Sequence, residues 1–162
     1  MESSRQVSRM LDTEHRSNLD LLGRIEQALA RPERAAADPE FPRLAGAFAR
    51  MVEQDIGRHF DFEEAQLFPR MADAGEGDIA GLLREEHDSI REVAAEVLPL
   101  ARAAASGTLD RAGFEELRRG ALELVERQVA HIQKETMALL PLLDDLLDDE
   151  IDRTLAFEYA AG

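Results

Sequence analysis

The sequence predicts an all-α fold, and three observations lead to that prediction. Alanine, leucine, glutamate and arginine, which favour helix, dominate a chain of 162 residues that has only 10 glycines and 6 prolines. Aromatic residues make up 5% of the chain and tryptophan is absent, which argues against a β-sandwich. Apolar residues recur in steps of three and four along four long segments, which is the spacing of amphipathic helices.

Each predicted helix is bounded by residues that break or cap helices. Three prolines within 32–42 end the first helix, and Gly75 follows the second. The third stops near Gly107, and Thr108 or Asp110 could cap the start of the fourth. The expected helices cover about residues 4–30, 42–73, 78–106 and 109–141, with a short helix over about 149–160.

Short connections between these helices imply that neighbours are antiparallel. We therefore expect an up-down-up-down four-helix bundle with a short C-terminal capping helix. No linker is long enough to divide the chain, so residues 1–162 are predicted to form one domain, which is large enough to bury a substantial core.

The composition argues against several classes of function. The formal net charge is −15, from 34 acidic and 19 basic residues, so the surface repels phosphate backbones and anionic lipids. We therefore expect no nucleic-acid and no membrane partner. The absence of cysteine excludes disulfides, thiolate metal sites and thiol catalysis. We find no signal sequence and no apolar run of about 18–20 residues, so a cytoplasmic location is expected.

The four histidines form two copies of one pattern, 72 residues apart. His15 pairs with His87 and His59 with His131, and several neighbouring residues keep the same offset. In letters, EH returns as EH, and HFDFEEAQLFP returns as HIQKETMALLP. The longer motif has a glutamate four residues after its histidine, and that spacing puts both side chains on one face of a helix.

These motifs are predicted to meet in one layer of the bundle. Each histidine lies in the apolar stripe of its helix. Counted from the connecting turns at about 1.5 Å per residue, the heights of neighbouring histidines agree to roughly 3–5 Å. The candidate metal ligands are His15, His59, Glu63, His87, His131 and Glu135.

The alternative to a metal site is a bundle whose histidines are ordinary core residues. A lone histidine on an apolar face usually is one, but burying two glutamates without a cation is strongly unfavourable. Imidazole and carboxylate without thiolate suit iron or manganese, and six ligands with two potential bridges ask for a pair of metals. We therefore favour two irons bridged by Glu63 and Glu135. His15 would share one iron with His59, and the other two histidines would share the second.

With these motifs the chain resembles the hemerythrin-like domain, also called the HHE cation-binding domain, over nearly its whole length. The resemblance implies a four-helix bundle with a non-heme di-iron centre, oxo- or hydroxo-bridged, in which manganese or zinc could substitute. Oxygen-carrying hemerythrins have His-x3-His in the third helix and His-x4-Asp in the fourth, whereas Arg91 and Thr136 stand at those positions here. The present set is similar to that of bacterial iron-centre repair proteins of nitrosative stress, and of an iron- and oxygen-sensing ubiquitin-ligase subunit.

Four further residues are candidates for supporting roles around the metals. Glu14 and Glu86, each one position before a histidine, could accept a proton from an imidazole or could simply be solvated. Arg91, one turn beyond a histidine, should point into the bundle. There it could pair with a bridging carboxylate or an anionic ligand, or form an ion pair with Asp55. Tyr159 is expected to serve packing.

Three functions follow from this reasoning. The first is a di-iron protein that binds or reacts with dioxygen or hydrogen peroxide. The second is an iron-handling protein, or one that senses iron and nitric oxide or repairs iron centres, without turnover of its own. The third is a structural bundle with idle histidines. We favour the first, predict no particular protein partner, and leave open whether the protein is an enzyme.

Overall fold

The computed structural model describes residues 5–162, which are almost entirely helical and contain no strand. The predicted all-α class is confirmed. None of the helices in this range is long and apolar enough to cross a membrane. With η denoting π and 3-10 turns, the elements are α1 (Gln6–Leu29), α2 (Pro32–Ala37), α3 (Phe41–Gln54), η1 (Asp55–His59), α4 (Phe60–Phe62), η2 (Glu63–Leu67), α5 (Phe68–Asp73), α6 (Gly77–Ala105), α7 (Arg111–Lys134), η3 (Glu135–Leu139), η4 (Leu140–Leu142), α8 (Leu143–Leu146) and α9 (Asp149–Ala161).

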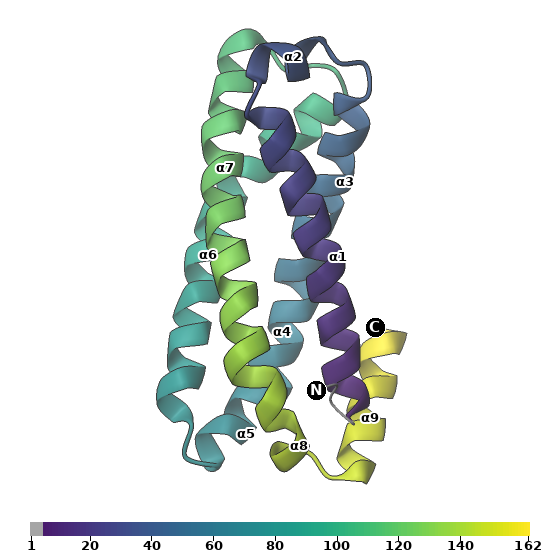
Figure 1. Cartoon of the computed structure of the whole chain (residues 1–162), viewed down its shortest axis with the longest axis vertical. Helices are drawn as coiled ribbons and strands as arrows, with labels where there is room; N and C mark the ends of the chain where they lie inside the picture. The colour runs from purple at the N-terminus through teal and green to yellow at the C-terminus, as the bar shows by residue number, and fades with distance from the viewer. Residues whose placement is uncertain (1–4) are drawn as a thin grey trace.

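The long helices α1, α3, α6 and α7 run side by side along the long axis of the molecule (Figure 1). α3 packs on α6, α6 on α7, α7 on α1 and α1 on α3, so the contacts close into a ring around a shared core. α2 lies at one end of the molecule, and α9 packs against α1 towards the other end (Figure 1).

The connection between the first two long helices contains a helix that the sequence analysis did not anticipate. α2 starts at Pro32, where the missing proline N–H costs nothing because the first N–H groups of a helix have no internal partner. The expected start of the first helix at about residue 4 lies outside the described residues, and α1 begins at Gln6.

The segments that carry the repeated histidine and glutamate motifs are interrupted by turns that are not regular α-helix. The Phe68 N–H bonds to the carbonyl of Glu63, five residues back instead of four. The Leu140 N–H bonds in the same way to the carbonyl of Glu135, and η1 has the same geometry. Such π turns accommodate an extra residue and are frequent at functional sites.

The repeated prolines account for two of these π turns. In a regular helix the rings of Pro69 and Pro141 would clash with the carbonyl group four residues back. η2 and η3 each end two residues before the proline, and their wider turn relieves that clash. The 72-residue repeat therefore extends from the side chains to the backbone.

The buried core is divided into two apolar clusters along the bundle. The larger one contains Phe48, Ile90 and Leu124 and includes Ala35 of α2. The smaller one contains Leu67 and Leu139 and includes residues of α9. The buried histidines lie near the change from one cluster to the other along each long helical segment, so a polar layer crosses the bundle there.

A buried carboxylate ties α9 to α1. The backbone N–H groups of Gln6 and Val7 donate to Asp152 at 2.9 and 3.0 Å, and this aspartate is only 4% exposed. The first N–H groups of a helix lack acceptors within it, and the N-terminal end of the helix dipole favours a negative charge. Asp152 therefore caps α1 from a different helix.

Replacing this cap should weaken the fold measurably. We expect Asp152→Ala to lower the free energy of unfolding by about 2 kcal/mol, because two helix N–H groups lose a charged acceptor. Urea denaturation followed by circular dichroism measures this change. Asp145→Ala, at an exposed position of α8, serves as the control and should change stability by less than about 0.5 kcal/mol. Equal effects of the two substitutions would show that Asp152 does not anchor α9.

Candidate metal centre

The structure brings all six predicted ligands together in the polar layer. They come from α1, η1, η2, α6, α7 and η3, and none is more than 2% exposed. The six residues form the His/Glu cluster: His15, His59, Glu63, His87, His131 and Glu135.

Two overlapping groups lie within the cluster, and in each the candidate ligand atoms are within 4.8 Å of one another. The first group consists of His15, His59 and both glutamates. The second group consists of His87, His131 and the same glutamates. The histidines are thus grouped in the pairs that the sequence analysis favoured.

The glutamates present one carboxylate oxygen to each group. Glu63 Oε1 lies 3.2 Å from Nε2 of His87, and Glu63 Oε2 lies 3.3 Å from Nε2 of His59. Glu135 Oε1 lies 3.6 Å from Nε2 of His87, and its Oε2 lies 3.8 Å from Nε2 of His15. Both carboxylates are therefore oriented as bridges between two positions.

Every histidine of the cluster turns Nε2 inwards and has an oxygen near Nδ1. An oxygen acceptor holds the ring proton on Nδ1, which leaves the lone pair of Nε2 directed into the cluster. Glu14 and Glu86, for which this role was one of the two alternatives considered, occupy such positions. We call the residues whose side-chain oxygens lie at Nδ1 the outer partners. The oxygen–Nδ1 distances are 2.8 Å for Glu14 and His59, 2.9 Å for Glu64 and His87, 2.8 Å for Glu86 and His131, and 3.3 Å for Thr136 and His15.

Many inward-facing atoms of the cluster make no hydrogen bond within residues 5–162. They are both carboxylate oxygens of Glu63 and Glu135 and the Nε2 atoms of His15, His87 and His131. Buried polar atoms without partners are costly, and carboxylates most of all. A cation that accepts nitrogen and oxygen ligands would satisfy all of them, so these residues fit a divalent metal.

A family model of the hemerythrin HHE cation-binding domain matches residues 6–143. The chain belongs to this hemerythrin family. The match covers α1 to the start of α8, so it includes the whole His/Glu cluster and leaves α9 outside. A comparison with curated proteins gave no match.

The pKa value of each group in the His/Glu cluster of this hemerythrin domain depends on burial and on the charges of its neighbours. Burial, together with the neighbouring carboxylate of Glu135, raises the pKa of Glu63 to about 7. Burial disfavours a charged imidazole at His87, but the adjacent carboxylates of Glu63 and Glu135 outweigh it and raise its pKa to about 9. Burial lowers the pKa of His15 to about 4. Without metal, protons on some of the histidines supply the positive charge that the two carboxylates require.

Arg91 does not form the ion pair with Asp55 that was one of the two alternatives considered for it. Asp55 is buried and accepts hydrogen bonds from Asn18 at 3.2 Å and Gln128 at 3.1 Å. The long side chain of Arg91 lets its guanidinium leave the apolar layer and contact the partly exposed Glu64. Arg91 thus does not point at the bridging glutamates of this hemerythrin site. It contacts Glu64, which in turn is the hydrogen-bond partner of His87.

Three residues near the cluster have roles that the sequence analysis missed. Glu64 and Thr136 each follow a cluster glutamate directly, at equivalent positions of the repeat, and that equivalence was the available signal. The hydroxyl of Tyr159 donates to Glu14 at 2.6 Å, and its ring meets the ring of His59 edge-on. No local sequence pattern points to Tyr159, because its place depends on how α9 packs.

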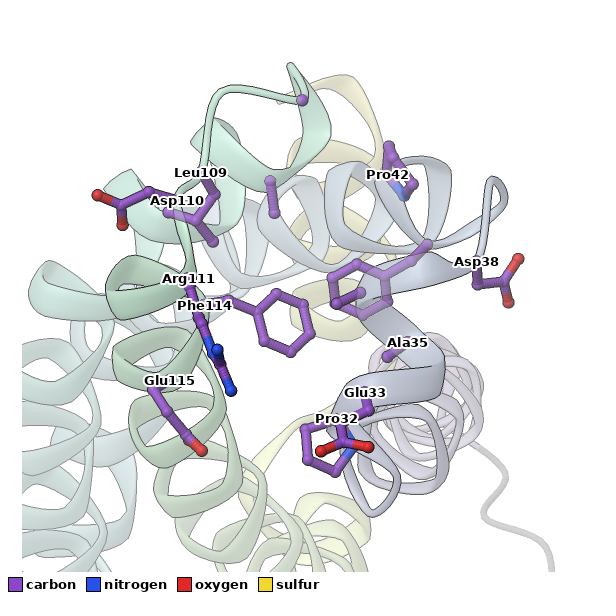
Figure 2. A pocket seen from close by; sticks show the side chains of 14 residues that line it. Pro32, Glu33, Ala35, Asp38, Pro42, Leu109, Asp110, Arg111, Phe114 and Glu115 are labelled. Carbon is purple, nitrogen blue, oxygen red and sulfur yellow. The ribbon is translucent and has the colours of Figure 1, made fainter.

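Two hollows differ in their relation to the cluster. A polar one of about 140 Å³ is lined by Glu14 and Tyr159, which adjoin His59. A larger one of about 610 Å³ lies at the α2 end, where Phe114 and Pro32 line it (Figure 2). No residue of the cluster lines either hollow, but Glu14 in the lining of the small one is a partner of His59, so only the small hollow adjoins the hemerythrin site.

Neutralising one bridging glutamate should stabilise the metal-free protein. A carboxyl whose folded pKa is raised, here from 4.5 to about 7, destabilises the fold increasingly as pH rises from 4.5 through 7. Glu63→Gln should therefore raise the free energy of unfolding of metal-free protein by about 1–3 kcal/mol at pH 8 and leave it nearly unchanged at pH 4. Denaturant titrations of chelator-treated protein at both pH values measure the difference.

Glu26→Gln, at an exposed position of α1, is the matched control and should have little effect at either pH. The interpretation fails if Glu63→Gln does not raise the free energy of unfolding of the metal-free protein at pH 8, or if it changes that free energy equally at pH 8 and pH 4.

Proposed function

We propose that the His/Glu cluster binds two iron ions, with Glu63 and Glu135 as bridging ligands and one pair of histidines on each ion. The observation that carries this proposal is the orientation of the two carboxylates, each of which presents one oxygen to each histidine pair.

We further propose that the helices form an up-down-up-down four-helix bundle over a single domain, with α9 as its capping helix.

In this proposal the chain's own residues fix the ligand geometry. Four outer oxygens hold the ring protons on Nδ1, so all four imidazoles offer Nε2 to the ions. The apolar clusters on either side keep water from competing for the ligands. A pair of ferrous ions would supply two electrons to a small oxidant, and each ion would have four protein ligands and room for further ones.

We propose that the substrate or ligand is a small oxidant, dioxygen or hydrogen peroxide. Complete burial of the cluster leaves no room for a large substrate, and the small polar hollow beside His59 suits molecules of a few atoms.

The second candidate is an iron-handling, nitric-oxide-sensing or iron-centre repair protein without turnover. The observation that favours it is the departure from the oxygen carriers, since Arg91 and Thr136 replace ligands of the carrier site. The four-histidine, two-glutamate set resembles that of the repair proteins and of the iron-sensing ligase subunit. The predicted cytoplasmic location and the absence of nucleic-acid and membrane partners stay predictions.

Removal of either bridge should empty the site. We expect Glu63→Ala and Glu135→Ala each to reduce bound iron from two ions per chain to less than one, because both ions lose a ligand. Iron is quantified by atomic absorption after anaerobic loading and desalting. Glu26→Ala serves as the control and should keep two ions. Full occupancy in either bridge variant would rule out the proposed centre.

Exposure to dioxygen separates the candidate functions. Anaerobic protein loaded with two ferrous ions per chain should convert to a ferric optical spectrum that persists after the gas is removed, and it should then consume hydrogen peroxide over many turnovers. A spectrum that reverses on removing dioxygen would instead identify a binder or sensor. Absence of peroxide turnover, with transfer of iron to an apo-protein acceptor, would favour the iron-handling candidate.

A further inference from the structure

Among the positions at which the two copies of the repeat differ, one pair contacts histidines of the cluster in both copies. Position 64 carries a glutamate, whereas position 136, 72 residues later, carries a threonine. Both side chains lie at the Nδ1 atom of a cluster histidine. Glu64 Oε2 is 2.9 Å from His87, and the hydroxyl of Thr136 is 3.3 Å from His15. The two otherwise similar halves of the site thus differ in a contact to a candidate ligand.

The hydroxyl of Thr136 can only accept from His15. Its single proton is donated to the carbonyl of Ile132 at 2.9 Å, so its lone pair faces the Nδ1–H of the imidazole. This contact is longer than the three carboxylate contacts in the cluster, and its acceptor is neutral. His15 is held in the tautomer that directs Nε2 inwards, but it receives no negative charge.

A carboxylate behind an imidazole makes the imidazole a stronger metal ligand. It draws the Nδ1 proton towards itself and so increases the basicity of Nε2, and loss of such a partner typically weakens metal binding by about 10–100-fold. In the second group both histidines have a carboxylate partner, Glu64 and Glu86. In the first group only His59 has one, which is Glu14.

The carboxylates of the second group are also held firmly. Arg91 contacts Glu64, and Lys134 contacts Glu86, so each carboxylate is fixed between a cation and a histidine. These cations reduce the net charge that the imidazoles experience. The hydrogen bonds to Nδ1 remain, at 2.9 and 2.8 Å, and with them the increase in ligand basicity.

We propose that the two metal positions are unequal, that the second group (His87 and His131) fills first, and that Thr136 and Glu64 are the positioning residues that set this order. The inference rests on the proposed two-metal centre. Because both positions share the bridging glutamates, the difference between them arises from the outer partners of the histidines. The affinities of the two positions should then differ by about 10-fold or more.

A titration with zinc tests the order of filling without any redox chemistry. Metal-free protein labelled with ¹⁵N-histidine is titrated with Zn²⁺ while the four Nε2 resonances are followed by NMR. The resonances of His87 and His131 should shift during the first equivalent, and those of His15 and His59 during the second. The opposite order, or simultaneous shifts of all four histidines, would overturn the inference.

Two substitutions should make the positions more alike. Thr136→Glu supplies the missing carboxylate, and Glu64→Gln removes the existing charge while keeping an oxygen acceptor. Thr136 is exposed and Glu64 is partly exposed, so neither change disturbs the core. Each should reduce the difference in affinity to less than about threefold. A difference that stays at its wild-type value in both variants contradicts the assigned roles.

Matched controls separate these effects from a general change in charge. Met137→Glu places the same new carboxylate one residue further along at a position that is 80% exposed, and Glu85→Gln removes a charge from an exposed site on α6. Both should leave the filling order unchanged. If wild-type protein takes up fewer than two zinc ions, the proposed two-metal centre itself is wrong. Two ions bound without any order overturn only the inferred asymmetry.

Discussion

Two carboxylates buried side by side in the middle of a helical bundle are the constraint on which the rest of this structure depends. Glu63 and Glu135 have no exposed surface, and such a pair is strongly unfavourable without compensating positive charge. Four imidazoles surround them, and without metal their protons provide part of this charge, which is why the pKa of His87 is raised. Two divalent cations would provide more charge in the same space and would satisfy the carboxylate oxygens that lack hydrogen bonds.

The same constraint explains the backbone and the core around the site. Each glutamate must approach the bundle axis from a segment that also delivers a histidine, four residues earlier, to the same layer. A π turn begins at each glutamate, and the following proline makes that turn preferable to a regular one. Since the polar layer opposes folding, the two apolar clusters on either side must supply the stability that keeps the helices in place.

Helix geometry explains why the cluster could be predicted from the sequence, whereas Glu64, Thr136 and Tyr159 around it could not. A histidine and a glutamate four residues apart lie on one face of a helix. The 72-residue repeat supplies two such helix faces, and antiparallel packing of the helices places them at the same height in the bundle. The partners at Nδ1 come from other helices, so their positions depend on packing. Glu64 reaches His87 from a π turn, whose altered rotation does not follow the regular helical period. Tyr159 reaches Glu14 because Asp152 anchors α9 on α1, a contact between residues far apart in the sequence.

Inequality between the two metal positions bears directly on the choice between the candidate functions. Reduction of a small oxidant by two electrons needs both ions to stay in place through the reaction, whereas donation of iron needs only one to leave. The bridging glutamates would remain with the ion held by His87 and His131 after the other ion departs. In the proposed centre, the threonine at the position equivalent to Glu64 would weaken binding of the ion at His15 without changing the other ligands. The metal affinity of the position at His15 and His59 would therefore determine whether this bundle is better suited to redox turnover or to release of iron.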